Sequence, residues 1–226
     1  MKKNKGEKMN TGHSGKTINV VIAGVGGQGS ITSGQIAARA AMLHGTEVAM
    51  SEVHGMAQRG GSVMSTVRYG SNQSPVIPMG EADFLLGFES LEALRYSPYL
   101  RSSGVAIVSD QRIIPTIEAL KKATYPTNIF AELKIQTKSA IFLPALEIAA
   151  EIGNPRLIGS VLLGAFSAFM DFSASIWKQA ITDIVPHATI ERNLQAFRAG
   201  YEFTIDADVL SAEKPVTVND SVFITA

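Results

Sequence analysis

The segment at residues 20–29 constrains the fold of this chain more than any other. Apolar β-branched residues lead into a loop with glycines at positions 24, 26, 27 and 29, and Gln28 lies between the last two. Gly24, Gly26 and Gly29 satisfy G-x-G-x-x-G, which joins a strand to a helix and lets backbone amides approach a phosphate. In that pattern Gly24 permits the tight turn, Gly26 the close approach of a ligand, and Gly29 close helix–strand packing. The alternatives are that the loop serves packing alone or receives the backbone of a partner.

The rest of the chain alternates strands and helices. Strand 17–23, helix 29–44 and strand 47–52 predict a βαβ unit, with Gly45 ending the helix. Further strands are expected at 62–69, 83–88 and 104–109, and helices at 90–97, 143–152, 156–171 and 188–201. This order predicts a Rossmann-like three-layer α/β/α fold with a mostly parallel sheet and a helical C-terminal part. We expect a disordered leader at 1–16, one α/β domain at 17–203 and an extended tail at 204–226.

Composition excludes several classes of function. The chain has no cysteine, so it can hold neither a disulfide, nor a thiolate zinc site, nor a cysteine-ligated iron–sulfur cluster. Its four histidines show no metal-binding spacing, and no metal site is expected. A net charge of zero gives no sign of nucleic-acid binding. The apolar run at 157–170 is too short for a membrane span, and a cytoplasmic protein is expected.

A second glycine-rich segment follows the predicted strand at 47–52 and is richer in chemistry than the first. Its candidate site residues are Glu52, His54, Gln58, Arg59, Gly60 and Gly61. His54 can move protons near neutral pH or make a structural hydrogen bond, and Arg59 can grip an anion or pair with Glu52. Ligands of open α/β sheets bind beyond the carboxyl ends of strands, so both glycine loops are expected at one sheet edge.

Three acidic residues and a serine complete the candidates. Glu47 or Glu52 lies about twenty residues beyond the first loop, where a dinucleotide fold holds the ribose hydroxyls. Glu89 follows a buried strand and is expected near the same edge. Ser90 is expected to cap the next helix.

The joint order of these motifs resembles the gamma-type domain of 2-oxoacid:ferredoxin oxidoreductases. The likeness covers residues 18–201, and the run at 52–61 is most similar to the beta subunit of the indolepyruvate type. It is carried by the following segments: 24–29, 52–63, 77–78, 80–83, 87–89, 154–155 and 162–165.

The resemblance implies a subunit that is inactive alone. In that family thiamine diphosphate and the iron–sulfur clusters lie on other domains, ferredoxin accepts the electrons and coenzyme A the acyl group. For the indolepyruvate type, a large alpha subunit carries the thiamine and cluster domains, so a hetero-oligomer is implied. The reaction would be oxidative decarboxylation of an aryl 2-oxoacid to its acyl-coenzyme A. We expect Gln58, Arg59, Gly60 and Gly61 to face the thiamine or coenzyme A, with His54 ordering their loop. No cofactor is expected on this chain alone.

Two other functions are compatible with the glycine loops. One is a free-standing NAD(P)-binding dehydrogenase, although the chain offers no separate substrate domain for hydride transfer. The other is a non-catalytic nucleotide-binding module for assembly. NADH binding by the isolated chain would favour the first, and co-expression with the large subunit separates the second from the oxidoreductase.

Overall fold

A single mixed sheet organises the molecule. The computed structural model describes residues 17–54, 60–70, 74–114, 124–137 and 139–206. Its strands are β1 (Ile18–Val25), β2 (Val48–His54), β3 (Ser62–Tyr69), β4 (Ala82–Gly87), β5 (Leu100–Ser109) and β6 (Ser139–Leu143). They lie in the order β2-β3-β1-β4-β5-β6. β1, β4, β5 and β6 are parallel neighbours, whereas β3 runs antiparallel to both β1 and β2.

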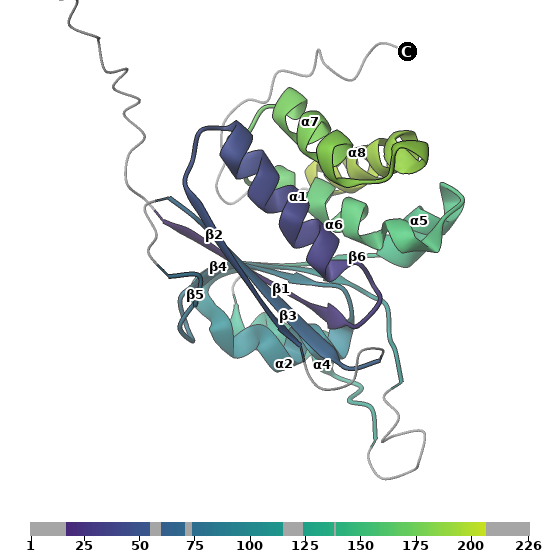
Figure 1. Cartoon of the computed structure of the whole chain (residues 1–226). Helices are drawn as coiled ribbons and strands as arrows, with labels where there is room; N and C mark the ends of the chain where they lie inside the picture. The colour runs from purple at the N-terminus through teal and green to yellow at the C-terminus, as the bar shows by residue number, and fades with distance from the viewer. Residues whose placement is uncertain (1–16, 55–59, 71–73, 115–123, 138, 207–226) are drawn as a thin grey trace, which may run out of the picture.

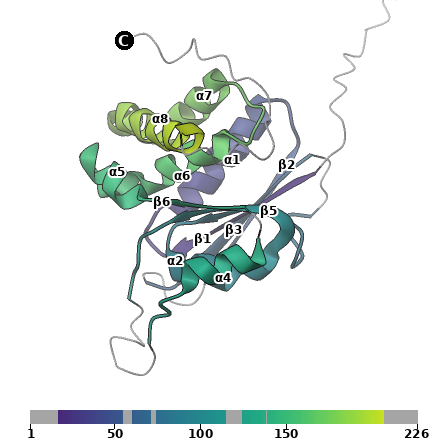
Figure 2. The same ribbon diagram turned by 180° about the vertical axis from the view of Figure 1, so that it is seen from behind.

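Helices cover both faces of the sheet, as predicted (Figures 1 and 2). The helices are α1 (Ser30–Leu43), α2 (Ser90–Tyr96), α4 (Ile129–Gln136), α5 (Ala145–Glu151), α6 (Ile158–Ser167), α7 (Ala174–Ile184) and α8 (Ile190–Asp206). Short 3₁₀ turns are η1 (Ser97–Tyr99), η2 (Pro155–Leu157) and η3 (His187–Thr189). α1 and α5 to α8 lie on one face, and α2 and α4 lie on the other. The three-layer α/β/α architecture is therefore confirmed.

The predicted βαβ unit is interrupted. β2 runs in the same direction as β1, but β3 lies between them and hydrogen-bonds to both. β3 returns antiparallel immediately after β2, which periodicity within single segments does not reveal. The two strands of the expected unit are therefore not neighbours.

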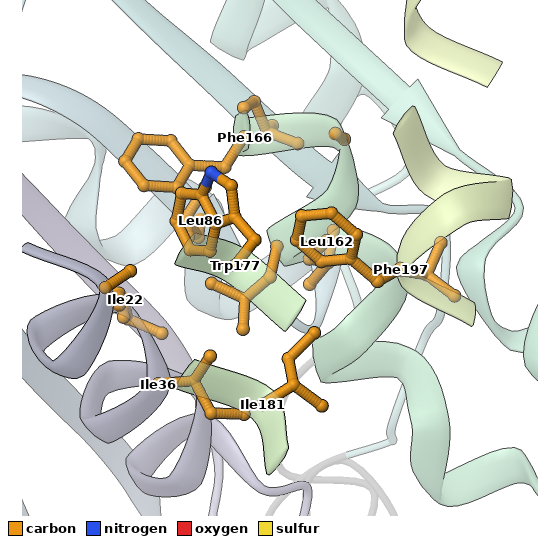
Figure 3. Close-up of a cluster of buried hydrophobic side chains, with 14 of the residues drawn as sticks. Ile22, Ile36, Leu86, Leu162, Phe166, Trp177, Ile181 and Phe197 are labelled. Carbon is orange, nitrogen blue, oxygen red and sulfur yellow. The ribbon is translucent and has the colours of Figure 1, made fainter. Parts of the chain in front are cut away.

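The larger core lies between the sheet and the five-helix layer. Trp177 of α7 packs on Phe166 of α6 and Phe197 of α8, with ring centroids 6.0 and 5.5 Å apart. Ile22 and Leu86 from the sheet complete this cluster (Figure 3). Every residue of α6 is buried, as expected of a helix enclosed on all sides.

Several segments differ from the expectations. β6, α4 and α7 were not predicted, and the helix expected at 143–152 begins only at Ala145 because Leu143 ends β6. α8 continues through Asp206, so residues 204–206 are helical rather than part of an extended tail. The expected leader at 1–16 and residues 207–226 lie outside the described part of the chain. Within that part, no helix is long and apolar enough to cross a bilayer.

Candidate functional site

Both glycine loops lie at one edge of the sheet. β1, β2, β4, β5 and β6 end at this edge and β3 begins there, with Val25 opposite Ser62 and His54 opposite Val63. The backbone N–H of Gly26 donates to the carbonyl of Gly61 across 2.8 Å. The expectation that the two loops share an edge is confirmed.

Two glycines of the first loop, Gly24 and Gly29, do not have the expected roles. Gly24 lies within β1, where a Cβ would stand 2.9 Å from Phe88 Cβ and 3.0 Å from Gln28 Oε1, so packing rather than a tight turn requires glycine. Gly29 has φ of 89°, and no atom beyond its immediate chain neighbours lies within 4 Å of a built Cβ, so it serves backbone conformation rather than helix–strand packing. Gly27 also has positive φ, 100°. The amide of Gly26 meets a neighbouring backbone of the same chain.

Gln28 points inward and ties the first loop to the sheet. Its Oε1 accepts the Val25 N–H at 2.6 Å. Its Nε2 donates to the Phe88 carbonyl at 3.1 Å and to Gln111 Oε1 at 2.8 Å. Both amide hydrogens are thereby used, so Gln28 links the ends of β1, β4 and β5.

The N-terminus of α1 opens at this edge without a side-chain cap. Gly29 is the N-cap residue, and the first turn carries no acidic side chain. The first amides of any helix lack carbonyl partners within it, and its dipole is positive there. This end of α1 is electrostatically compatible with an anion or with carbonyl groups of a partner.

The second glycine loop is described at its two ends. Glu52 is half-buried in β2 opposite Ser65, and His54 ends that strand. Gly60 has φ of 73° and is exposed. Gln58, Arg59 and the side chain of His54 lie outside the described residues. The alternative role of Arg59, an ion pair with Glu52, therefore also lies outside them.

The expected ribose-binding role of Glu47 is wrong. Glu47 precedes β2 at the opposite edge of the sheet, where its carbonyl accepts the N–H of Gly70 at 2.9 Å. Glu52 is closer to the loops, but β3 separates its strand from β1. A dinucleotide site requires the acidic residue on a strand beside the glycine loop, so this arrangement argues against the dehydrogenase alternative.

Glu89, rather than Ser90, caps α2. Glu89 Oε2 accepts the Glu92 N–H at 2.9 Å, whereas Ser90 Oγ donates to the Ser109 carbonyl. Glu89 Oε1 also accepts from the Ile113 N–H at 3.1 Å and the Tyr125 hydroxyl at 2.5 Å. Burial, and then the hydrogen bond to Glu89, raise the pKa of Tyr125. Glu89 is 1% exposed and lies near the expected edge.

Sequence reasoning missed Glu92, a second buried carboxylate at this edge. It accepts a hydrogen bond from Ser62 Oγ at the start of β3, and its other oxygen lies 3.3 Å from Arg95 Nη1. Burial raises the pKa of Glu92, the Ser62 hydrogen bond and Arg95 oppose that shift, and Glu89 reinforces it. An acid in the first turn of a helix commonly reflects the helix dipole, so the sequence carried no signal of this partner.

No metal centre is formed by the described side chains. None of their histidine, aspartate and glutamate residues gather in a group of three or more that could hold an ion. The whole chain lacks cysteine, so no cysteine-held cluster can reside on it.

The class of protein is a Rossmann-like three-layer α/β domain in which two glycine loops meet at one edge of the sheet. Residues 19–203 match the family described as pyruvate ferredoxin/flavodoxin oxidoreductase, and the chain belongs to that family. It is a gamma-type subunit of a 2-oxoacid:ferredoxin oxidoreductase.

The alignments with similar proteins extend over nearly the whole domain. The chain is 38% identical to indolepyruvate oxidoreductase subunit IorB of Archaeoglobus fulgidus, over 83% of this chain and 96% of that protein. The gamma subunit of a keto/oxoacid ferredoxin oxidoreductase from Geobacter sulfurreducens has a TM-score of 0.62 at 26% identity, covering 84% and 99% of the two chains. A 2-oxoglutarate:ferredoxin oxidoreductase from Magnetococcus marinus shares the fold, with a TM-score of 0.68 at 22% identity. There the match covers 92% of this chain but 34% of the other, so this fold is one part of a longer polypeptide.

Proposed function

We propose that this chain is the small subunit of an indolepyruvate-type oxidoreductase and works only with a large alpha subunit. The complex decarboxylates an aryl 2-oxoacid oxidatively, forms its acyl-coenzyme A and passes the electrons to ferredoxin. The observation that carries the site assignment is the hydrogen bond between Gly26 and Gly61, which joins two glycine loops at the edge where α/β sheets bind ligands.

Substrate class follows from sequence similarity. The Archaeoglobus relative that covers 83% of this chain is an indolepyruvate oxidoreductase subunit. This chain contributes only one edge of its sheet to the active site of the complex. The large planar aryl group of the substrate would therefore be bound mostly by the alpha subunit. The aryl 2-oxoacid is therefore the substrate we assign to the complex.

Cofactor placement follows from what this chain lacks. Without cysteine it cannot carry cysteine-ligated iron–sulfur clusters. We assign these clusters to the alpha subunit, together with thiamine diphosphate, as the family resemblance implies. When bound there, thiamine diphosphate supplies the carbanion chemistry of decarboxylation. The residues of this chain close the site, exclude water and orient the reactants.

The second glycine loop is the part of this chain that we assign to the active site of the complex. Gln58, Arg59, Gly60 and Gly61 face the thiamine or coenzyme A, and His54 orders the loop, with Glu52 behind it. Support comes from the loop's ends, since β2 delivers His54 to the edge and Gly61 contacts the first loop. The first loop, with Gly24, Gly26, Gly27, Gln28 and Gly29, serves as an anion or interface loop.

Reconstitution tests this function. The chain is co-expressed with a candidate large subunit, and reduction of a viologen dye is followed with indolepyruvate, pyruvate and 2-oxoglutarate in the presence of coenzyme A. We expect activity only in the complex, with the highest kcat/KM for indolepyruvate. A higher kcat/KM for 2-oxoglutarate or pyruvate overturns the substrate assignment. Activity of the isolated chain with NAD(P) overturns the subunit assignment.

A further inference from the structure

Glu92 and Ser62 connect helix α2 to the second glycine loop. Ser62 is the first residue of β3 and follows Gly61 directly, while Glu92 lies in the first turn of α2. The Ser62 hydroxyl donates to Glu92 Oε2. Because Gly61 accepts the amide of Gly26, a displacement of Ser62 would move both glycine loops.

A third residue, Tyr96, extends this hydrogen bond into a chain. Tyr96 lies one helical turn after Glu92, and its hydroxyl is 3.0 Å from Ser62 Oγ. A serine hydroxyl has one hydrogen to donate, and that hydrogen goes to the carboxylate. The Tyr96 hydroxyl therefore donates to Ser62, which gives a chain from Tyr96 through Ser62 to Glu92.

Helix α2 is itself held firmly, so it can act as a fixed support. Glu89 caps its first turn and binds Ile113 and Tyr125 beyond β5. Arg95 Nη1 lies 3.3 Å from Glu92 Oε1, so Glu92 Oε2 remains free to accept the hydrogen bond from Ser62. Glu92 is 5% exposed, although a carboxylate is costly to bury without partners. The Glu92 carboxylate therefore holds the start of β3 in place through its hydrogen bond with Ser62.

We propose that Glu92 is a positioning residue for the oxidoreductase reaction. It holds Ser62, with Tyr96, so that the Gly60–Gly61 backbone stays seated against Gly26 in the orientation that the complex requires. The kinetic consequences of this inference rest on the function proposed above, whereas the anchoring of the two loops does not.

The expected kinetic effect concerns KM rather than kcat. When the anchor is lost, the loop occupies the competent orientation for a smaller fraction of time, and apparent affinity falls by that fraction. The net loss of a typical intramolecular hydrogen bond corresponds to roughly a fivefold change in such a population.

The experiment compares four variants of the full chain within the assembled complex. Ser62→Ala removes the donor, Tyr96→Phe removes the second hydroxyl, and Glu92→Gln keeps an acceptor for Ser62. Asp83→Asn is the matched control, because Asp83 is also 5% exposed but binds Asn19 and Arg101 at the opposite edge of the sheet. The KM for the 2-oxoacid and for coenzyme A, kcat, and hydrogen–deuterium exchange of the Gly26 amide are measured for each.

We expect Ser62→Ala to raise at least one KM about fivefold, with kcat within about twofold of the wild type. Exchange of the Gly26 amide should accelerate by a similar factor, about fivefold. Tyr96→Phe should have a smaller effect, Glu92→Gln should keep both values near wild type because it retains an acceptor for Ser62, and Asp83→Asn should leave both unchanged.

Two results overturn the proposal. One is unchanged exchange of the Gly26 amide in Ser62→Ala, and the other is the same change in Asp83→Asn. If the wild-type complex oxidises no 2-oxoacid, the function proposed above fails, but exchange in the full chain still decides whether Ser62 and Glu92 anchor the loops.

Discussion

The carbonyl oxygen of Phe197 in α8 lies where a side chain at Gly164 of α6 would begin. A Cβ built on Gly164 would stand 1.8 Å from that oxygen. The contact is reciprocal, because a Cβ on Gly200 of α8 would stand 1.9 Å from the carbonyl of Val161 in α6. The two helices thus touch through their backbones, which only glycine permits at both positions.

Gly164→Ala should therefore destabilise the protein severely. The added methyl group collides with backbone rather than with a side chain that could turn away, so α6 and α8 must separate. We expect a loss of about 3 kcal/mol in the free energy of unfolding. Urea denaturation followed by circular dichroism measures this loss. Gln195→Ala on the exposed face of α8 is the control, and equal stability of the two variants would contradict the helix contact.

Gln28→Ala should destabilise the first glycine loop. The change leaves the Val25 amide, the Phe88 carbonyl and the Gln111 side chain without their partner. We expect a loss of about 2 kcal/mol, because these groups are half-buried and water replaces part of the bonding. Thermal unfolding reports the loss. Gln35→Ala, on the exposed face of α1, should change stability by less than about 0.5 kcal/mol.

Glu92→Gln should alter how stability depends on pH. Burial raises the pKa of Glu92 in the folded state, despite the Ser62 hydrogen bond and Arg95, so ionisation is more costly there than in the unfolded chain. The stability that the protonated side chain contributes is complete below the unfolded pKa and is lost as pH rises through the folded pKa.

Wild type should consequently lose stability relative to Glu92→Gln as pH rises from about 4 toward neutrality, because glutamine does not ionise. Chemical denaturation of both proteins across this range, in parallel, measures the difference. The facing groups Arg95, Glu89 and Tyr96 are present in both proteins, so the comparison isolates the Glu92 side chain. A difference that stays constant or shrinks over the range would be the contrary result.

Arg59→Ala in the reconstituted complex should raise the KM for the 2-oxoacid or for coenzyme A. A guanidinium that binds an anionic reactant contributes roughly 1.5–3 kcal/mol, which corresponds to a rise of about tenfold or more. Steady-state kinetics with each reactant varied in turn measures it. Arg192→Ala on the exposed face of α8 is the control. Unchanged kinetics in Arg59→Ala would remove Arg59 from the site.

Much of the framework was predictable from local patterns. The strand at β3 was expected at 62–69 and is found there, and helix α1 ends before Gly45, whose φ is 84°. By contrast, the sequence of the short strand β6 shows no alternation of polar and apolar residues, and Pro144 directly after it resembles the first turn of a helix. Local pattern therefore assigned Leu143 to the wrong element.

The candidate site was predictable only in part. Two glycine loops at strand ends were expected at one edge because parallel strands share that edge, and the Gly26–Gly61 hydrogen bond shows that they meet. The capping of α2 by Glu89 and the pairing of Glu92 with Ser62 were not predictable. The cap is local, but glutamate is not among the favoured capping residues. The contacts of Glu89 with Ile113 and Tyr125, and of Glu92 with Ser62, join residues 24 to 36 positions apart, for which a single sequence offers no periodic signal.

The sequence by itself determined the alternation of strands and helices, the absence of any thiolate ligand, and the order of motifs that marks the family. These follow from side-chain chemistry and from backbone preferences of neighbouring residues. Only the tertiary structure decided that β3 lies between β1 and β2, that Gln28 faces inward, and that Glu92 supports the start of β3. The physical reason is that these outcomes depend on hydrogen bonds between distant segments, which form once the sheet order brings their partners together.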